Sequence, residues 1–125
     1  MPKIRSAIKS VLIIDIIDHE NNNLISIFLE HGIDLDIVSY HDNYKYMMDS
    51  KQYDCIMLNS DMKDNLTEKI IDYIKVTYPG TIVVVLLENP SYEKVFQFIR
   101  ISVDDFIMKP YTWDDIEKLL RFYYF

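Results

Sequence analysis

The sequence predicts an α/β fold in which a doubly wound, five-stranded parallel sheet is covered by helices on both faces. Short apolar runs of strand length alternate five times with segments whose apolar residues recur at helical spacing. These runs are apolar at nearly every position, as strands buried on both faces require. Two glycines and four prolines leave room only for short connections. Right-handed crossovers between parallel strands then give a three-layer sandwich.

The first half of the chain supplies three strands and two helices. Gly32 is expected to end the first helix, because glycine readily adopts the left-handed conformation found after helix C-termini. Asp18, His19 and Glu20 are expected to cap the start of that helix. The predicted strands cover residues 11–14, 35–39 and 55–58, and the predicted helices cover 24–32 and 44–50.

The second half of the chain continues the same alternation. Ser91 and Thr112 are expected to cap two helices, and Asp115 lies three residues after Thr112, as in a capping box. The pair Pro79-Gly80 is expected to end the preceding helix. The predicted strands cover residues 82–87 and 106–108, and the predicted helices cover about 70–78, 91–101 and 112–120.

Length and composition predict one domain over residues 1–125. A second possibility is that this domain is the N-terminal part of a longer regulator. A single cysteine, Cys55, favours a reducing compartment. No apolar stretch is long enough for a secretory signal or a membrane span, so we expect a cytoplasmic protein that does not bind membranes. The net charge of −7 argues against nucleic-acid binding by this domain alone.

Motifs for catalysis are missing from the sequence, and we expect no enzymatic activity. There is no glycine-rich phosphate loop, no Cys/His pair and no Ser/His/Asp set at the predicted strand ends. His19, His31 and His41 have no spacing that suggests a metal site. Ligands of doubly wound sheets bind at the carboxyl ends of the strands, which here are residues 15–16, 59–62, 87–89 and 108–110.

Three segments resemble the receiver domain of two-component response regulators, of which CheY is typical. The most specific is Asp104-Asp105-Phe106-Ile107-Met108-Lys109-Pro110, and residues 11–15 and 53–58 resemble the family's first and third strands. The resemblance extends from about residue 11 to residue 123. It implies a flavodoxin-like (βα)5 sandwich with the strand order 2-1-3-4-5, and it implies a cis Lys109-Pro110 bond.

The resemblance also implies a phosphorylation pocket that is degenerate here. Family members use an aspartate as the phosphoryl acceptor, two acidic residues for Mg²⁺, a hydroxyl residue and a lysine. The acceptor position is Asn59, the second acidic position is Ile16 and the hydroxyl position is Leu87, whereas Asp15 and Lys109 are kept. Phe106 occupies the place of the family's switch aromatic.

This pocket is expected to bind neither phosphate nor Mg²⁺ well. An amide cannot form an acyl phosphate, and Mg²⁺ requires about six oxygen ligands, of which carboxylates usually supply one or two. We therefore expect no cofactor and no phosphorylation at Asn59. Lys109 is expected to form a salt bridge with Asp15 or a hydrogen bond with Asn59. Glu88 is expected either to pair with Lys109 or to be a surface charge.

The function that the sequence favours is phosphorylation-independent binding of a protein partner or of a second copy. The resemblance implies that the binding face comprises the fourth helix, the fifth strand and the fifth helix, because receiver domains use this face for dimers. The alternative is a phosphorylation-responsive switch with a displaced acceptor, either Asp61 or Asn59 after deamidation. The aromatic end of the chain is either a contact surface or packs on a following domain. The candidate interface residues are Asp104, Asp105, Tyr111, Trp113, Phe122 and Tyr123.

Overall fold

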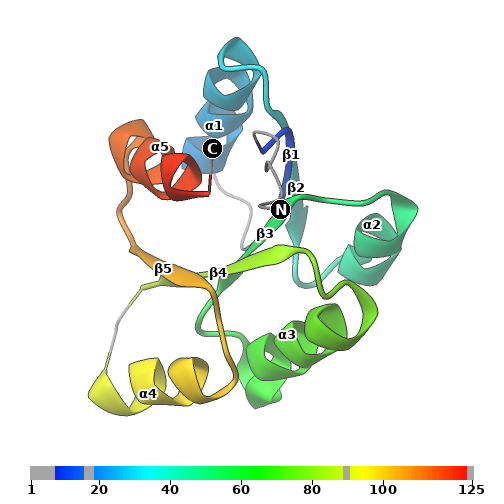
Figure 1. Ribbon diagram of the computed structural model, residues 1–125, viewed down its shortest axis with the longest axis vertical. Coiled ribbons are helices and arrows are strands. Elements are labelled where there is room, and N and C mark those ends of the chain that lie inside the picture. The colour runs from blue at the N-terminus through cyan, green and yellow to red at the C-terminus, as the bar shows by residue number, and fades with distance from the viewer. Residues whose placement is uncertain (1–7, 16–18, 89–90, 124–125) are drawn as a thin grey trace, which may run out of the picture.

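The computed structural model, which describes residues 8–15, 19–88 and 91–123, contains one parallel sheet with the strand order β2-β1-β3-β4-β5 (Figure 1). This confirms the predicted fold class and strand order. The strands are β1 (Ser10–Asp15), β2 (Asp34–Ser39), β3 (Cys55–Asn59), β4 (Ile82–Leu87) and β5 (Asp105–Met108). The helices are α1 (His19–Glu30), α2 (Tyr44–Ser50), α3 (Leu66–Thr77), α4 (Tyr92–Arg100) and α5 (Trp113–Phe122), and a short 3₁₀ turn, η1, covers Lys63–Asn65.

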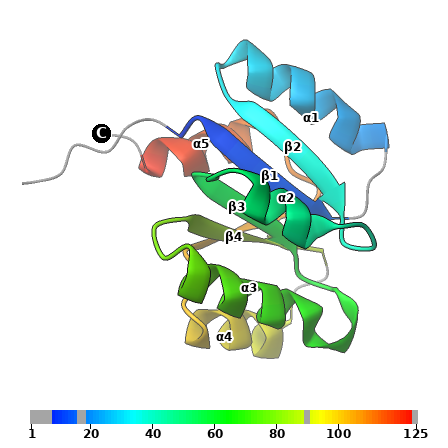
Figure 2. The same ribbon diagram turned by 90° about the vertical axis from the view of Figure 1, so that its right-hand side faces the viewer.

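Helices cover both faces of the sheet (Figures 1 and 2). Helices α1 and α5 pack on one face, and α2, α3 and α4 pack on the other. Alternate residues of each strand point to opposite faces, so Val11 and Ile13 belong to the first core while Leu12 and Ile14 belong to the second. This two-sided burial is the reason that the strands read as continuous apolar runs.

Helices α4 and α5 begin with the expected side-chain caps. The Ser91 side chain accepts a hydrogen bond from the backbone N–H of Lys94, and Thr112 and Asp115 form the expected capping box. Gly32, two residues after the end of α1, has a φ of 76°, in the left-handed region. The expected cap at Asp18, His19 and Glu20 involves residue 18 and side chains that lie outside the described residues.

The turn between β3 and α3 was not predicted. Asp64 and Asn65 have φ values of 57° and 58°, and both lie in the left-handed region. Asp and Asn tolerate this conformation better than other non-glycine residues. The turn carries the chain from the end of β3 into α3, and it therefore shapes the loop beside the candidate site.

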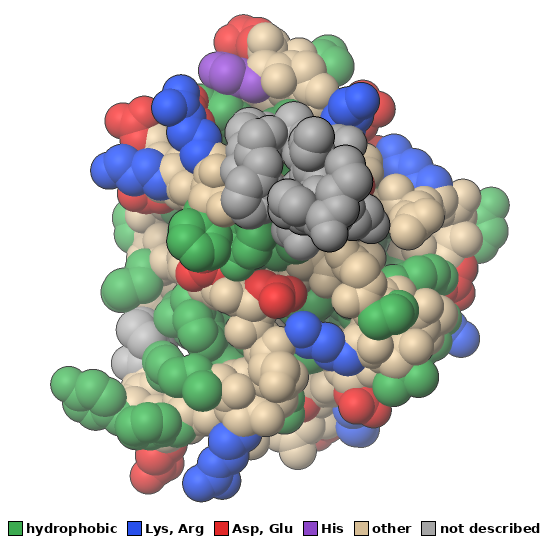
Figure 3. All heavy atoms as spheres, in the orientation of Figure 1, with side chains coloured by type: hydrophobic (Ala, Val, Ile, Leu, Met, Phe, Trp, Pro, Cys, Tyr) green, Lys and Arg blue, Asp and Glu red, His purple; other side chains and the backbone are tan. Residues whose placement is uncertain are grey.

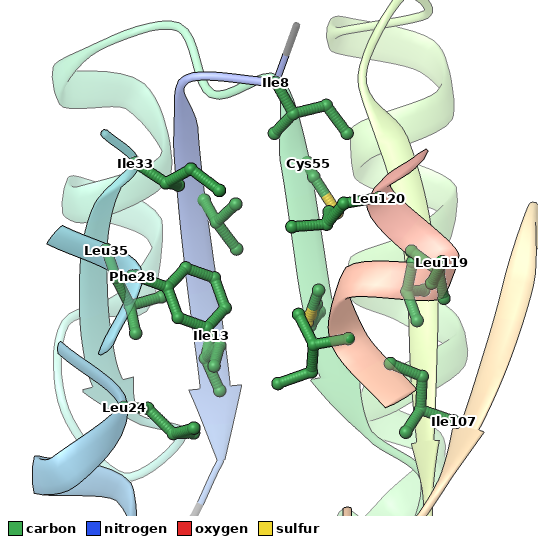
Figure 4. Packing of buried hydrophobic residues seen from close by; sticks show 14 of the residues in the cluster. Ile8, Ile13, Leu24, Phe28, Ile33, Leu35, Cys55, Ile107, Leu119 and Leu120 are labelled. Atoms are coloured by element: carbon green, nitrogen blue, oxygen red, sulfur yellow. The ribbon is translucent and has the colours of Figure 1, made fainter. Parts of the chain in front are cut away.

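Cys55 lies in the core between the sheet and α5, where Figure 4 shows it beside Leu120. Burial raises the pKa of its thiol well above the usual range. Because the thiolate is the reactive form, we expect the folded protein to react with a thiol-modifying disulfide reagent only when it unfolds. The rate of modification under native conditions, compared with that in denaturant, tests this; fast native modification would contradict it.

No helix in the described part of the chain is both long enough and apolar enough to cross a membrane.

Candidate functional site

The candidate site lies at the carboxyl ends of the central strands. Asp15 is the last residue of β1, Asn59 is the last residue of β3, and Lys109 directly follows β5. The register pairs Ile14 with Leu58, so the next residues along, Asp15 and Asn59, also lie side by side. Parallel strands therefore bring together side chains that are 44 residues apart in the chain.

Three of the predicted pocket residues form a hydrogen-bonded network. The Asn59 amide Nδ2 donates to Asp15 Oδ1 over 2.7 Å, and the Lys109 ammonium Nζ donates to Asp15 Oδ2 over 2.5 Å. Asp15 and Asn59 are buried, and the Lys109 side chain is 20% exposed. Of the two contacts expected for Lys109, the ion pair with Asp15 is present, and the Lys109-Pro110 peptide bond is cis as expected.

The oxygen atoms of Asn59 are also engaged. Its side-chain Oδ1 accepts a hydrogen bond of 2.6 Å from the backbone N–H of Asp61, and its backbone oxygen accepts one of 2.8 Å from the Thr67 hydroxyl. The Ser60 backbone N–H donates to Leu86 O on β4. Hydrogen bonds with β1, α3 and β4 therefore hold residues 59 and 60 in place.

The Lys109 ammonium balances the negative charge of Asp15, as a bound metal cation would do in a pocket with more carboxylates. Both carboxylate oxygens of Asp15 accept a hydrogen bond, and the Lys109 ammonium offsets the negative charge. Leu87 is buried and presents hydrocarbon at the expected hydroxyl position, while Glu88 is exposed. Ile16 lies outside the described residues. Among the described residues, no group of three or more His, Cys, Asp or Glu side chains is arranged to hold a metal ion.

Asp61, the alternative acceptor, lies at the mouth of this site. Its carboxylate Oδ1 forms an ion pair with Lys94 Nζ of α4. The two side chains are 30% and 31% exposed. This contact connects α4 to the loop that follows β3, and it was not predicted because the two residues are 33 positions apart in the chain.

A groove runs along β5 beside α5 and has a volume of about 500 Å³. Phe106 lines it and is half-buried, with its ring centroid 6.5 Å from that of Phe98 of α4. Met108 and Phe122 line the groove and are exposed. Asp105 also lines it, and its Oδ1 accepts a hydrogen bond from the Phe106 N–H.

Four of the six candidate interface residues make contacts within the domain and do not line this groove. Tyr111, Trp113 and Tyr123 pack against the core on the α1–α5 side of the sheet. The Trp113 ring contacts Phe28 of α1 and His31, which follows α1, with centroid distances of 5.2 and 4.3 Å. Asp104 accepts a 2.7 Å hydrogen bond from the backbone N–H of Val83 on β4. Only Asp105 and Phe122 of the six line the groove.

Helix α4 contributes an exposed apolar stripe that was not identified from the sequence. Tyr92, Phe96 and Ile99 follow one another at intervals of four and three residues, so they share one face of the helix. All three are exposed. Figure 3 shows hydrophobic side chains gathered along the left and lower left of the molecule, over β5 and α4. We call Tyr92, Phe96, Ile99, Met108 and Phe122 the apolar face.

No family model and no curated protein matches the chain. Solved structures do match it. An orphan response regulator of H. pylori is 25% identical, with a TM-score of 0.74 over 90% of this chain and 91% of that chain. The chemotaxis protein CheY4 of Vibrio cholerae is 15% identical, with a TM-score of 0.81 over 94% and 99% of the two chains.

A two-component response regulator from Clostridium difficile is a third similar structure, at 21% identity and a TM-score of 0.77. The match covers 90% of this chain and 93% of that chain. Similarity along almost the whole length of these chains bears out the resemblance that was inferred from residues 104–110 and the two earlier segments.

Proposed function

Because the chain has the receiver fold of two-component response regulators, we propose that it is an atypical receiver domain that binds a protein partner without being phosphorylated. The observation that supports this most directly is the network of Asn59, Asp15 and Lys109. An amide occupies the position that the family resemblance assigns to the phosphoryl acceptor, and Lys109 pairs with Asp15. We propose neither a catalytic step nor a bound cofactor.

The chemistry of phosphoryl transfer explains why this network argues against phosphorylation. The reaction depends on a nucleophile held in line and on cations that neutralise the charge of the transferred group. The Asn59 amide offers no such nucleophile, and its Nδ2 donates to Asp15. The Lys109 ammonium, which would have to meet the phosphoryl oxygens, already pairs with Asp15.

Deamidation of Asn59 would supply a carboxylate, but the local backbone opposes it. The reaction requires the backbone nitrogen of the next residue, Ser60, to attack the side-chain carbonyl carbon. That nitrogen donates a hydrogen bond of 3.0 Å to the backbone oxygen of Leu86 on β4. Attack would therefore require the hydrogen bond from Ser60 to Leu86 to break.

Asp61 is also a poor substitute for the acceptor. Its carboxylate pairs with Lys94 at the mouth of the site, whereas the retained Lys109 pairs with Asp15 in the interior. A phosphoryl group on Asp61 would have to displace Lys94 or to form without the help of Lys109. These contacts favour the interaction module over the displaced-acceptor switch.

The apolar face is the surface that we propose for docking. Exposed apolar patches on soluble domains often mark sites of protein contact. This face has both a ridge, on α4, and a groove, between β5 and α5, and the groove carries charges of both signs from Asp105, Asp115 and Lys118. A surface with a ridge, a groove and both signs of charge can complement itself, so a second copy of the chain is the first partner to test.

Self-association tests this proposal. We expect Phe96→Ser to raise the dissociation constant of the dimer by about tenfold or more, because a buried aromatic anchor contributes well over 1 kcal/mol to an interface. Val76→Ser is the matched control, since Val76 is 77% exposed on α3, against 61% for Phe96 on α4. Sedimentation velocity over a concentration series measures both variants against wild type.

Acetyl phosphate and Mg²⁺ are added in a parallel series, and we expect no change in the dissociation constant. Association that strengthens only with acetyl phosphate would contradict the proposal and favour the switch. A chain that stays monomeric at every concentration would exclude the second copy, and a different protein would then have to occupy the face.

A further inference from the structure

Helix α4 has few apolar attachments to the rest of the domain. Phe98 is its buried residue, and the exposed stripe of Tyr92, Phe96 and Ile99 faces away from the core. Its partly buried Val95 packs against the same core as Phe98. A helix of nine residues with one fully buried side chain depends on other contacts for its position.

The ion pair between Lys94 and Asp61, which we call the α4 ion pair, is such a contact. Lys94 precedes Phe98 by four residues, which is about 6 Å along the helix axis. Two attachments one turn apart determine the direction of a helix better than a single one does. The α4 ion pair is therefore placed to fix the first turn of α4, whereas Phe98 fixes the second half.

The same contact leads back to the buried network. The Asp61 backbone N–H donates to Asn59, and Asn59 donates to Asp15, which accepts from Lys109 directly after β5. The polar contacts thus run without a break from α4 to the end of β5. Both of these elements contribute to the apolar face.

We propose that the α4 ion pair sets the position of α4, and with it the apolar stripe, and that ionic competition with this pair controls the docking face. This inference rests on the proposed function for its biological meaning. The pair is about two-thirds buried, yet its exposed third lets salt reach it. An anion or a partner carboxylate that attracts Lys94 would release the first turn of α4.

Hydrogen–deuterium exchange of residues 92–100 tests this inference on the isolated chain. We expect Lys94→Met and Asp61→Asn each to speed exchange in α4 by about tenfold, while exchange in α3 stays unchanged. The double variant should be no faster than either single variant, because both remove the same contact. Raising the salt concentration from about 0.05 M to about 1 M should speed α4 exchange in wild type but not in the variants.

The design excludes a trivial effect on helix propensity. Lys94 lies in the first turn of α4, where a cation opposes the helix dipole, so its removal alone would stabilise the helix. Lys51→Met, which breaks the distant ion pair with Asp36, is the matched control and should leave α4 exchange unchanged.

Unchanged α4 exchange in Lys94→Met, or salt dependence that persists in that variant, would overturn the inference. Neither result would affect the proposed docking function, because exchange is measured without a partner. Conversely, a chain that binds no partner would still show the exchange effects if the α4 ion pair acts as we propose.

Discussion

Lys109→Met is expected to lower the free energy of unfolding by about 3 kcal/mol, because it leaves the buried carboxylate of Asp15 without the cation that Lys109 supplies. The cost arises from desolvation. A carboxylate held in the interior has lost its hydration, and the ammonium 2.5 Å away offsets that loss. Chemical denaturation at neutral pH, fitted to a two-state transition, measures the effect.

Lys51→Met provides the matched control for this prediction. Lys51 forms an ion pair of 3.1 Å with Asp36, but both side chains are more than a third exposed, so its loss should cost less than about 1 kcal/mol. Asp15→Asn combined with Lys109→Met should be less destabilising than Lys109→Met alone, because the double variant buries no charge. Equal losses of stability in Lys109→Met and Lys51→Met would contradict the account.

Asn59→Asp is expected to lower the free energy of unfolding by about 2 kcal/mol at neutral pH. The new carboxylate would replace an amide that now donates to Asp15 Oδ1 over 2.7 Å, so two like charges would meet in a buried site. The nearby Lys109 can neutralise only one of them. Deamidation of Asn59 would produce the same aspartate side chain, so this variant also tests whether a deamidated chain could serve as a phosphoryl acceptor.

The pH dependence of this variant follows from the sign of the expected pKa shift. Burial and a neighbouring carboxylate would raise the pKa of the new group above its unfolded value of about 4. The folded state would then hold the proton more tightly, so the variant is near wild type below about pH 4 and loses stability as the pH rises through the folded pKa. Denaturation at several pH values measures this loss.

Asn65→Asp is the control for Asn59→Asp, because it makes the same chemical change at an exposed position of the same loop. We expect a change within about 0.5 kcal/mol. If Asn59→Asp were as stable as Asn65→Asp at neutral pH, the pocket would accommodate a second carboxylate, and the proposed basis for its inactivity would fail.

The fold was predictable because its main determinants are local. Each buried strand is apolar on both of its faces, and the caps at Ser91 and Thr112 depend on side chains within three residues of the backbone groups that they bind. The cis bond at Lys109-Pro110 followed from the resemblance of residues 104–110 to a known segment. The left-handed turn at Asp64 and Asn65 carries no comparably strong signal, since neither residue is glycine.

The residues of the candidate site could be predicted from the sequence, but only some of the contacts among them could. Asp15, Asn59 and Lys109 could be assigned to the carboxyl ends of predicted strands, and the family resemblance grouped them into one pocket. The ion pair of Lys109 with Asp15 was expected, whereas the hydrogen bond from Asn59 to Asp15 was not specified. Ion pairs such as Lys94 with Asp61 depend on the path of a loop, which sequence patterns do not determine.

The elements of the proposed docking face were expected from the sequence, but most of its residues were not. In α4, Val95 and Phe98 turn inward while Phe96 and Ile99 turn outward, yet both pairs are apolar and separated by three residues. Helical spacing therefore could not distinguish the buried stripe from the exposed one. Trp113 illustrates the same limit, because its position at the start of α5 did not reveal that its ring packs on α1.

The contacts among Asp15, Asn59 and Lys109 are proposed to close the pocket to metal and phosphate, and an NMR titration of the wild-type chain tests this most directly. Amide shifts are followed while Mg²⁺ and then beryllium fluoride, a phosphoryl mimic, are added. We predict no saturable shift at residues 59–61, 87–88 or 109. Saturable shifts at these residues in the presence of both additives would show that the pocket still receives a metal ion and a phosphoryl group.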